Sequence, residues 1–290
     1  MVFQGFKTED TPKHLRVIDA NARDTLYHIW LRNFRENLER ISVGSIEQQK
    51  IFGNRTALIV GAGPSLKKQY NILQYGRGIP DGIEIFCADR VFKTLRNLRC
   101  PITYIVTVDA DDKIAEYYEE PASEILYPSS ILPVTCSPKV RPQGWERWYI
   151  PSIDPQTDKI LQLMTDLPII QSYGNVGATC CALAEYLGYK EIVLVGMDLA
   201  YDIDTPYEQM DWYNKLKEAG GEEMAKKAHK IIEHKVWKTK CISDPLMDAY
   251  RLSFYQFLSQ TKCKVISSVE GGSIEHPRLE YKRLEEILDK

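Results

Sequence analysis

The sequence predicts a doubly wound, mainly parallel α/β sheet, and three observations support that fold class. Short, continuous apolar runs recur from residue 56 onward, as expected of strands buried on both faces of a sheet. Segments of helical length separate these runs, and such alternation is typical of a parallel sheet with helices on both faces. The first run ends in a glycine-rich turn that leads into a polar segment of helical length.

Residues 1–54 predict a helical extension in front of this sheet. The segment is rich in charge, and its apolar residues recur at helical spacing, which indicates one or two amphipathic helices. These apolar residues are Leu26, Ile29, Trp30, Phe34, Leu38 and Ile41. We expect the extension to pack on the main domain or, in a homo-oligomer, on a second subunit.

The main domain, residues 55–290, is expected to be Rossmann-like and to carry the catalytic site. Its predicted strands are 57–60, 83–87, 104–108, 192–195 and 264–267. Its predicted helices are 66–75, 90–98, 176–187 and 244–259. Pro245 suits the first turn of the last helix, where its missing N–H group is not needed.

Two segments interrupt the alternation. Residues 121–155 hold many of the prolines and two tryptophans, and predict an irregular excursion that carries part of a substrate pocket. A short strand at 125–127 fits this excursion, with no assigned place in the sheet. Residues 202–242 are polar, charged and helix-prone, with Gly220-Gly221 as a flexible joint, and predict a helical lid.

Composition excludes several classes of protein. The formal net charge of −3 and the pI of about 6.0 provide no basic face, so we expect no nucleic-acid partner. The seven cysteines are odd in number and form no CxxC pair, which indicates reduced core residues rather than metal ligands. The N-terminus lacks the features of a signal peptide, and no apolar run approaches the roughly 20 residues of a membrane helix. We therefore expect a soluble, cytoplasmic protein.

The glycine-rich turn after the first strand is Gly61-Ala62-Gly63-Pro64-Ser65. Its glycines permit positive φ and close backbone approach, and Pro64 and Ser65 suit the start of a helix whose dipole favours phosphate. The turn is neither a Walker loop nor the full GxGxxG fingerprint, so a plain tight turn is an equal alternative. Gly174-Asn175 opens a second helix, where Asn175 either caps the helix or hydrogen-bonds a ligand.

Acidic residues follow three of the predicted strands, at Asp89, Asp109 and Asp198. The carboxyl ends of parallel strands form the ligand crevice of such sheets, so three acids at equivalent ends indicate a binding site. Any one of the three residues taken alone is better explained as a helix cap. Asp111 and Asp112 join Asp109 as ligands for a divalent cation or, alternatively, as first-turn helix residues.

Several of these motifs resemble one family over most of residues 55–275. The stretches are Ala57-Leu58-Ile59-Val60-Gly61-Ala62-Gly63-Pro64-Ser65-Leu66, Cys87-Ala88-Asp89-Arg90, Val106-Thr107-Val108-Asp109, Gly174-Asn175-Val176-Gly177-Ala178-Thr179 and Val195-Gly196-Met197-Asp198. They resemble the MptE-like superfamily, which includes archaeal 6-hydroxymethylpterin diphosphokinases and the motility-associated factor (Maf) glycosyltransferases of flagellin modification. The segment Glu270-Gly271-Gly272-Ser273-Ile274 and the long lid look more like the glycosyltransferase branch.

That branch implies a nucleotide-activated donor, a CMP-nonulosonate of the sialic or pseudaminic type, a hydroxyl acceptor and no required cofactor. The chain also resembles bacterial sialyltransferases, in which a Gly-x-Gly-Pro-Ser-Leu turn lies against CMP and a Gly-x-Asp passage, here Gly196-Met197-Asp198, follows. In those enzymes the lid carries a catalytic histidine. His229 and His234 fall in the predicted lid, although the motif around that histidine is not reproduced.

The pterin kinases imply an alternative, diphosphate transfer from ATP with magnesium. They carry Asp-Leu-Asp-Gly after the third strand, where this chain has Asp109-Ala110-Asp111-Asp112, so two of the four motif residues are replaced. Asp109, Asp111 and Asp112 would be the metal ligands in that case, whereas the glycosyltransferase branch implies no metal. A third alternative is a nucleotide-binding protein without catalytic activity.

Overall fold

The computed structural model describes residues 13–288 except positions 43, 52, 77, 120–126, 143 and 211, and its side chains from residue 26 onward. The chain forms two compact units, each of which has its own network of contacts. Unit 1 comprises Met1–Gln48 and Thr107–Gln171, and unit 2 comprises Gln49–Val106 and Ser172–Lys290. The expected domain boundary at residue 54 remains a prediction.

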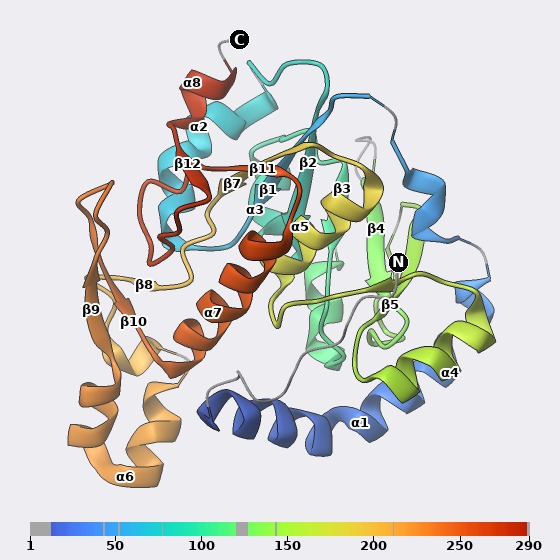
Figure 1. Ribbon diagram of the computed structural model, residues 1–290, viewed down its shortest axis with the longest axis horizontal. Coiled ribbons are helices and arrows are strands. Elements are labelled where there is room, and N and C mark those ends of the chain that lie inside the picture. Colours follow the sequence, from blue (N-terminus) through green and yellow to red (C-terminus); the bar gives the residue numbers. More distant parts are fainter. Residues whose placement is uncertain are drawn as a thin grey trace. The chain divides into compact units, whose positions relative to one another are not determined.

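Unit 2 contains a parallel sheet, which confirms the predicted fold class (Figure 1). Along the sheet the strands are β12 (Leu279–Tyr281), β11 (Lys264–Ser267), β7 (Glu191–Val195), β1 (Thr56–Val60), β2 (Ile83–Ala88) and β3 (Tyr104–Val106). The chain runs outward from β1 to β2 and β3, and then in the opposite direction from β7 to β11 and β12. This reversal beside β1 is the strand order of doubly wound dinucleotide-binding folds. The sequence did not predict β12, and β3 ends two residues earlier than expected.

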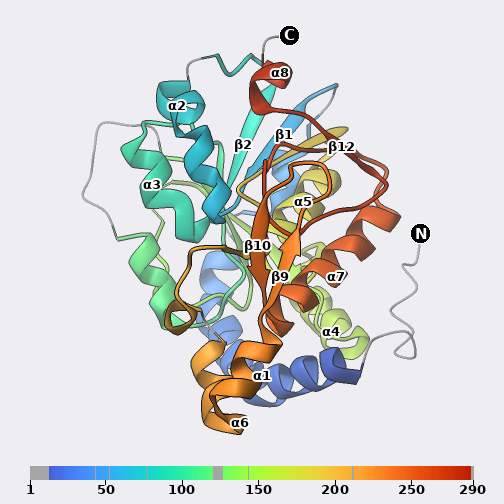
Figure 2. The same ribbon diagram turned by 90° about the vertical axis from the view of Figure 1, so that its left-hand side faces the viewer.

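Helices cover both faces of this sheet (Figure 2). The short helices α2 (Tyr70–Leu73) and α3 (Phe92–Asn97) lie on one face, and α5 (Val176–Leu187) and α7 (Pro245–Gln260) lie on the other. Helix α5 has the predicted bounds because Asn175 caps its start and Gly188 ends it in the left-handed conformation. The chain ends with α8 (Leu284–Leu288).

The prediction of one continuous helix over residues 66–75 is wrong, because most of this segment is 3-10 helix. The chain forms the 3-10 helix η2 (Pro64–Gln69), a single α turn in α2 and a second 3-10 turn, η3 (Gln74–Gly76). The Leu66 N–H donates to Gly63 O, which is the i→i+3 bond of the tighter helix. Likewise, the helix predicted at 90–98 begins as the 3-10 turn η4 (Asp89–Val91) before α3.

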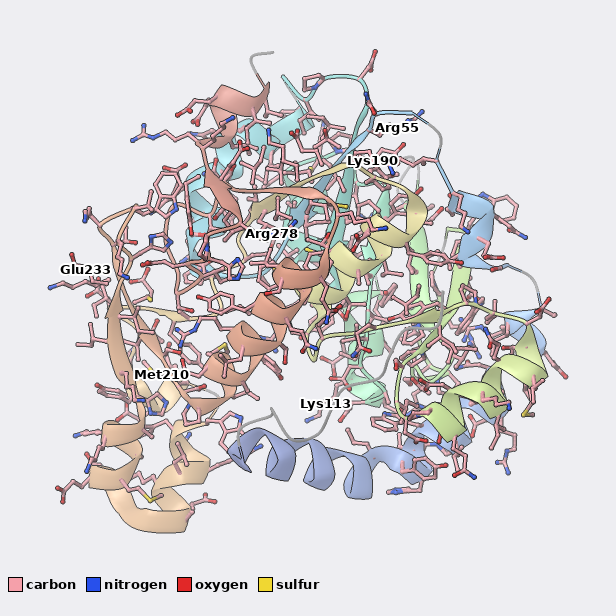
Figure 3. All side chains as sticks on the ribbon, viewed as in Figure 1. Arg55, Lys113, Lys190, Met210, Glu233 and Arg278 are labelled. Atoms are coloured by element: carbon pink, nitrogen blue, oxygen red, sulfur yellow. The ribbon has the colours of Figure 1, made fainter. Side chains whose placement is uncertain are left out.

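The lid of unit 2 is only partly helical, which corrects the helical prediction. It contains the 3-10 turn η6 (Tyr207–Gln209), helix α6 (Tyr213–Ala228) and an antiparallel sheet ordered β8 (Tyr201–Asp202), β10 (Lys240–Ser243), β9 (Lys230–Glu233). Gly221, with φ 84° and ψ 170°, breaks α6, as expected of the Gly220-Gly221 joint. β-Branched residues within β9 and β10 favour strands over helix. Met210, labelled in Figure 3, lies in the lid's own buried cluster, whereas Glu233 is exposed.

Unit 1 contains a second set of parallel strands, β4 (Ser129–Pro133), β5 (Glu146–Pro151) and β6 (Ile169–Ile170), in that order. Its helices are α1 (Lys13–Ile41), η5 (Asp112–Tyr117) and α4 (Pro155–Thr165), and η1 (Ile46–Gln49) follows α1 along the chain. The prediction of an irregular excursion over 121–155 is therefore wrong, because β4 and β5 lie within it. Their core residues Trp148 and Tyr149 are fully buried. Most of the strand predicted at 125–127 lies outside the described residues.

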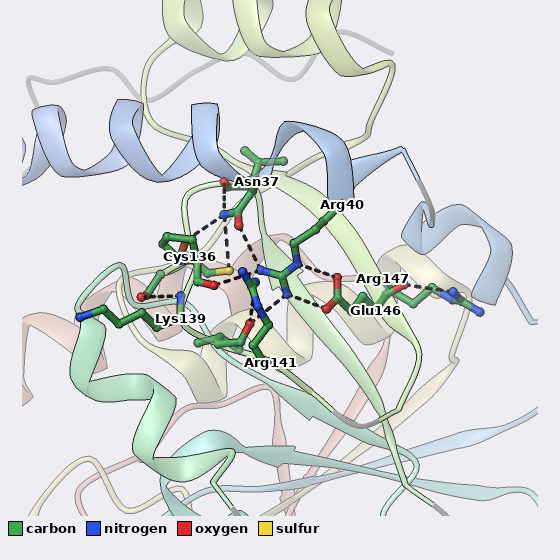
Figure 4. A network of polar contacts seen from close by, with 11 residues as sticks. Asn37, Arg40, Cys136, Lys139, Arg141, Glu146 and Arg147 are labelled. Atoms are coloured by element: carbon green, nitrogen blue, oxygen red, sulfur yellow. Dashed lines mark hydrogen bonds and ion pairs between the residues drawn. The ribbon is translucent and has the colours of Figure 1, made fainter.

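Helix α1 is a single helix whose buried face is more polar than the sequence suggested (Figure 4). Asn33 and Asn37 are fully buried. The Asn37 amide donates to Val134 O at 3.2 Å and to Cys136 O at 2.9 Å, and the Asn33 amide donates to Ala110 O and Thr135 O. One turn further on, Arg40 forms an ion pair with Glu146 and donates to Val140 O.

All seven cysteines are buried free thiols, as predicted. Burial raises the pKa of every one of these thiols, so the reactive thiolate form is disfavoured. Across the part of the chain that the structure describes, no helix is both long enough and apolar enough to cross a bilayer.

Candidate functional site

The candidate site lies where the strand order of unit 2 reverses, between the carboxyl ends of β1 and β7. Ligands of doubly wound sheets bind at this position, because loops that leave in opposite directions open a crevice there. The glycine turn follows β1, and Gly196-Met197-Asp198 follows β7. The two segments are joined by hydrogen bonds from the Gly61 N–H to Val195 O (2.9 Å) and from the Gly63 N–H to Gly196 O (2.8 Å).

Close approach explains the glycines of this turn, whereas a left-handed backbone does not. Neither Gly61 nor Gly63 has a positive φ, which corrects one reason given for them. A Cβ on Gly61 would lie 2.5 Å from Gly196 O, and one on Gly63 would overlap Asp198 Oδ2. The N–H groups of Gly61 and Gly63 donate to backbone oxygens of the β7 segment. A phosphate would have to compete with those bonds, so phosphate binding by the turn remains a prediction.

Asp198 is the buried centre of the site. Its carboxylate accepts the Ser65 N–H at 3.2 Å and the Ser65 hydroxyl at 2.7 Å. Burial raises the pKa of Asp198 to about 7, although the Ser65 hydrogen bonds and the charge of Lys68 oppose this shift. A carboxyl group with such a pKa exchanges its proton near neutral pH, as a general acid or base requires.

The loop after β11 wraps around Asp198 from the other side. The Ser273 N–H donates to Asp198 O at 2.8 Å, and a Cβ on Gly272 would lie 2.5 Å from Asp198 Cα. Glu270, within this loop, has a φ of 55°, and its carbonyl oxygen accepts a hydrogen bond from Lys68 Nζ (2.6 Å). The turn after β1 and the loop after β11 therefore pack on the same residue, the first on the carboxylate of Asp198 and the second on its backbone.

The helix start predicted at Gly174-Asn175 lies beside the same segment. Asn175 Oδ1 accepts the Ala178 N–H at 2.9 Å, so Asn175 is a helix cap. Its Nδ2 is buried and has no hydrogen-bond partner in the structure, which leaves a donor for a ligand. A Cβ on Gly177 would overlap the sulfur of Met197, so this glycine allows α5 to pack on the β7 segment.

Three residues other than glycine adopt positive φ in the loops around this site: Tyr173 (50°), Leu199 (44°) and Glu270 (55°). By contrast, Asp166 and Lys238 have local explanations, since the first caps α4 and the second lies in a hairpin turn. Left-handed backbone costs energy for such residues and is concentrated at functional sites in proteins. Backbone strain and the raised pKa of Asp198 therefore coincide.

The family is established by the sequence itself. The matching family model is described as "6-hydroxymethylpterin diphosphokinase MptE-like" and covers residues 28–204, more than half of the chain. The chain belongs to the MptE-like family. The match contains the glycine turn and Asp198, whereas it ends near the start of the lid.

A solved structure supports the fold of this MptE-like chain. It is described as the MAf glycosyltransferase from Magnetospirillum magneticum AMB-1, and superposes with a TM-score of 0.58 at 13% sequence identity. The alignment covers 86% of this chain and 38% of the glycosyltransferase. At this identity the likeness shows the fold alone. No curated protein matches the sequence significantly.

Among the predicted acids of the MptE-like chain, Asp89 and Asp198 belong to unit 2, whereas Asp109, Asp111 and Asp112 belong to unit 1. Asp89 is buried after β2 and accepts the N–H of Arg90 at 2.7 Å. Its negative charge contributes to the raised pKa of the buried thiols Cys87 and Cys180.

The acids proposed as metal ligands make local contacts instead. Asp109 Oδ1 accepts the Asp111 N–H, and Asp111 in turn caps η5 through the Lys113 N–H. Lys139 and the Ser137 hydroxyl contact Asp112 and lower its pKa. Within the described residues, no group of three or more His, Cys, Asp or Glu side chains is arranged to hold a metal ion.

His229, in the lid, is fully buried next to Asp244, the capping residue of α7. Its Nδ1 contacts Ala225 O at 2.7 Å, and its Nε2 lies 4.0 Å from Asp244 Oδ2 without a hydrogen-bond partner. The Tyr201 hydroxyl donates to the same Asp244 oxygen at 3.1 Å. The helix start at Asp244 could be predicted from the sequence, whereas this network could not, because its members are far apart along the chain.

His234 has both ring nitrogens engaged by the backbone. Its Nδ1 accepts the N–H groups of Val236 and Trp237, each at 3.2 Å, and its Nε2 lies 3.1 Å from Ile274 O. Burial lowers the pKa of His234. In this arrangement neither nitrogen is available to a substrate, so of the two lid histidines only His229 has an unengaged nitrogen.

Proposed function

We propose that this chain is the catalytic core of a glycosyltransferase that takes a nucleotide-activated sugar, of the CMP-nonulosonate class, and transfers the sugar to a hydroxyl acceptor. The observation that carries the proposal is the meeting of the glycine turn with Asp198 at the reversal of strand order. The fold shared with the Magnetospirillum glycosyltransferase supports this choice within the MptE-like family.

The nucleotide is proposed to lie over the glycine turn and the start of α5. Asn175 offers a buried N–H group without a partner, and the ammonium of Lys68 lies at the edge of the same site. Both can bind phosphate oxygens without a metal. A monophosphate leaving group carries less charge than a diphosphate, so these donors suffice to stabilise it.

Transfer requires a base for the acceptor. The acceptor oxygen loses its proton to the base and bonds to the anomeric carbon. The bond between that carbon and the phosphate oxygen breaks, and CMP leaves with the electron pair. With a pKa of about 7, Asp198 is suited to take the proton, and His229 is the second candidate.

The family description favours a second candidate, diphosphate transfer from ATP. That reaction requires magnesium to bridge the phosphates, and Asp109, Asp111 and Asp112 would hold it. These acids would first have to leave the hydrogen bonds and the ion pair that they form in this structure. A nucleotide-binding protein without catalysis is the third alternative.

Thermal unfolding with CMP, CDP, UDP and ATP, each with magnesium or with EDTA, distinguishes these alternatives. A ligand that binds only the native state raises the unfolding temperature. We expect CMP to raise the unfolding temperature in the presence of EDTA. In a separate assay of sugar transfer, we expect Asp109→Asn to lower the rate less than Asp198→Asn does. Asp81→Asn, at an exposed turn, is the matched control.

Two results would overturn the proposal. Stabilisation by ATP that requires magnesium and is lost in Asp109→Asn would establish the diphosphokinase alternative. Stabilisation by CMP without transfer from any CMP-activated sugar to a hydroxyl acceptor would support a binding protein.

A further inference from the structure

The tip of the lid hairpin, residues 234–239 between β9 and β10, is organised by one side chain. The His234 N–H donates to Thr239 O at 2.9 Å, which closes the tip. Inside it, His234 Nδ1 accepts the N–H groups of Val236 and Trp237. Because Nδ1 accepts, the ring proton is on Nε2, which donates to Ile274 O.

The same tip is attached to the segment that encloses Asp198. Ile274 directly follows Ser273, whose N–H donates to Asp198 O. The Lys235 N–H donates to Glu275 Oε1 at 2.6 Å. The His234 ring also packs edge-on against Tyr281, with centroids 5.6 Å apart. One histidine therefore both shapes the hairpin tip and fastens it beside the site.

Thr239, at the end of this tip, faces the site with an unused hydroxyl. Its Oγ1 and Asp198 Oδ1 both lie within 4 Å of the point where a Cβ on Gly271 would be. The hydroxyl oxygen is buried and has no hydrogen-bond partner. Leaving a buried hydroxyl without a partner destabilises the folded protein, so such a group in a native protein calls for a partner.

We propose that Thr239 binds a phosphate or sugar oxygen of the ligand beside Asp198, and that His234 is the positioning residue that holds Thr239 there. The identity of the ligand rests on the proposed function, whereas the role of His234 in fastening the hairpin does not. Only the neutral ring can accept the two N–H groups, so protonation of His234 releases the tip.

Several charged or titratable groups surround His234 and decide when this release occurs. Glu275, whose Oε1 lies 3.8 Å from Nδ1, favours protonation, while Lys235 lies 3.9 Å from the other oxygen of Glu275 and offsets its charge. Tyr281 presents its ring, and the hydroxyl of Tyr255 accepts the Glu275 N–H. Burial outweighs the attraction of Glu275 and keeps the ring neutral near pH 7.

Hydrogen exchange without any ligand tests the fastening. We expect the protection factors of the Val236 and Trp237 amides to fall as the pH is lowered and the His234 ring becomes protonated, and to be low at every pH in His234→Gln. His28→Gln, at an exposed position of α1, is the control and should leave them unchanged. Protection that persists in a folded His234→Gln protein would overturn the role of His234.

Isothermal titration of the wild type with CMP or its activated sugar tests Thr239. Thr239→Val removes the hydroxyl and keeps the shape, so we expect binding about tenfold weaker, with recovery in Thr239→Ser. Thr94→Val, within α3, is the control. Equal affinity of wild type and Thr239→Val would overturn the role of Thr239. If the wild type binds no nucleotide at all, the proposed function itself fails, and the exchange experiment still decides the role of His234.

Discussion

At the scale of single residues, the burial of Asp198 explains most features of the site. The carboxylate occupies the space that a side chain on Gly63 would fill, and accepts both polar hydrogens of Ser65. These two hydrogen bonds replace water only in part, so its pKa rises to about 7. The position of Asp198 after a strand could be predicted from the sequence, whereas its contact with Ser65, 133 positions away, depends on the fold.

The raised pKa of Asp198 has a measurable effect on stability. The native state holds this proton up to about pH 7, and the unfolded chain releases it near pH 4, so folding becomes less favourable as the pH rises between these values. The free energy of unfolding should fall by on the order of 4 kcal/mol over that range through this group. In Asp198→Asn this part of the pH dependence of the free energy of unfolding should be absent.

Urea unfolding of wild type and Asp198→Asn from pH 4 to 8 measures the difference. Asp81→Asn, an exposed acid, should follow the wild type. Parallel curves for wild type and Asp198→Asn would contradict a raised pKa.

At the scale of elements, strands and capped helices were predictable and the polar contacts between elements were not. β1 and α5 follow from a buried apolar run and from Asn175 and Gly188 at the helix ends. The β9–β10 hairpin was missed because its sequence is charged and lacks the glycine pairs that mark tight hairpins. Helix α1 was predicted to bury apolar residues, yet Leu38 is exposed and Asn37 is buried. Asn37 is buried because its amide donates to the carbonyl oxygens of Val134 and Cys136 in the loop after β4, and the sequence does not show that these oxygens need a donor.

The buried face of α1 yields a prediction about unit 1. Asn37→Ala leaves the carbonyls of Val134 and Cys136 buried without the amide donor, and also removes the oxygen that accepts Arg40 Nη1 at 3.1 Å. We expect the free energy of unfolding to fall by about 2–4 kcal/mol, because each lost partner costs roughly 1–3 kcal/mol and part is recovered by relaxation. Chemical denaturation followed by circular dichroism measures this loss.

Glu36→Ala, one position earlier on the exposed side of α1, is the control and should change the stability by less than about 0.5 kcal/mol. If Asn37→Ala were as stable as this control, hydrogen bonding would not be what holds the helix.

At the scale of the whole molecule, composition proved informative about the cysteines. An odd number without CxxC spacing indicated reduced core residues, and the structure buries all seven. They come from both units and from strands, helices and loops alike. Since thiols act as small apolar groups when buried, their reactivity reports on the integrity of the entire fold.

We therefore expect the native protein to react very slowly with Ellman's reagent at pH 8, and to show seven reactive thiols after unfolding in guanidinium chloride. The raised pKa of each thiol and its burial act in the same direction. Rapid reaction of one thiol in the folded protein would show local opening around that residue.

The crowding of glycines around Asp198 also bears on how such a protein diversifies. A side chain would overlap backbone atoms or the Asp198 carboxylate at each of four glycines, Gly61, Gly63, Gly196 and Gly272. A substitution at one of them is therefore tolerated only if a second substitution makes room for it. Such paired changes are rare, and most single mutants would be eliminated. Exposed side chains of the hairpin tip, such as Lys235, have no such restriction, in contrast to His234 and Thr239 of the same tip. We expect inherited variation, and with it new preferences for the ligand, to accumulate at exposed positions of the lid while the glycine turn stays fixed.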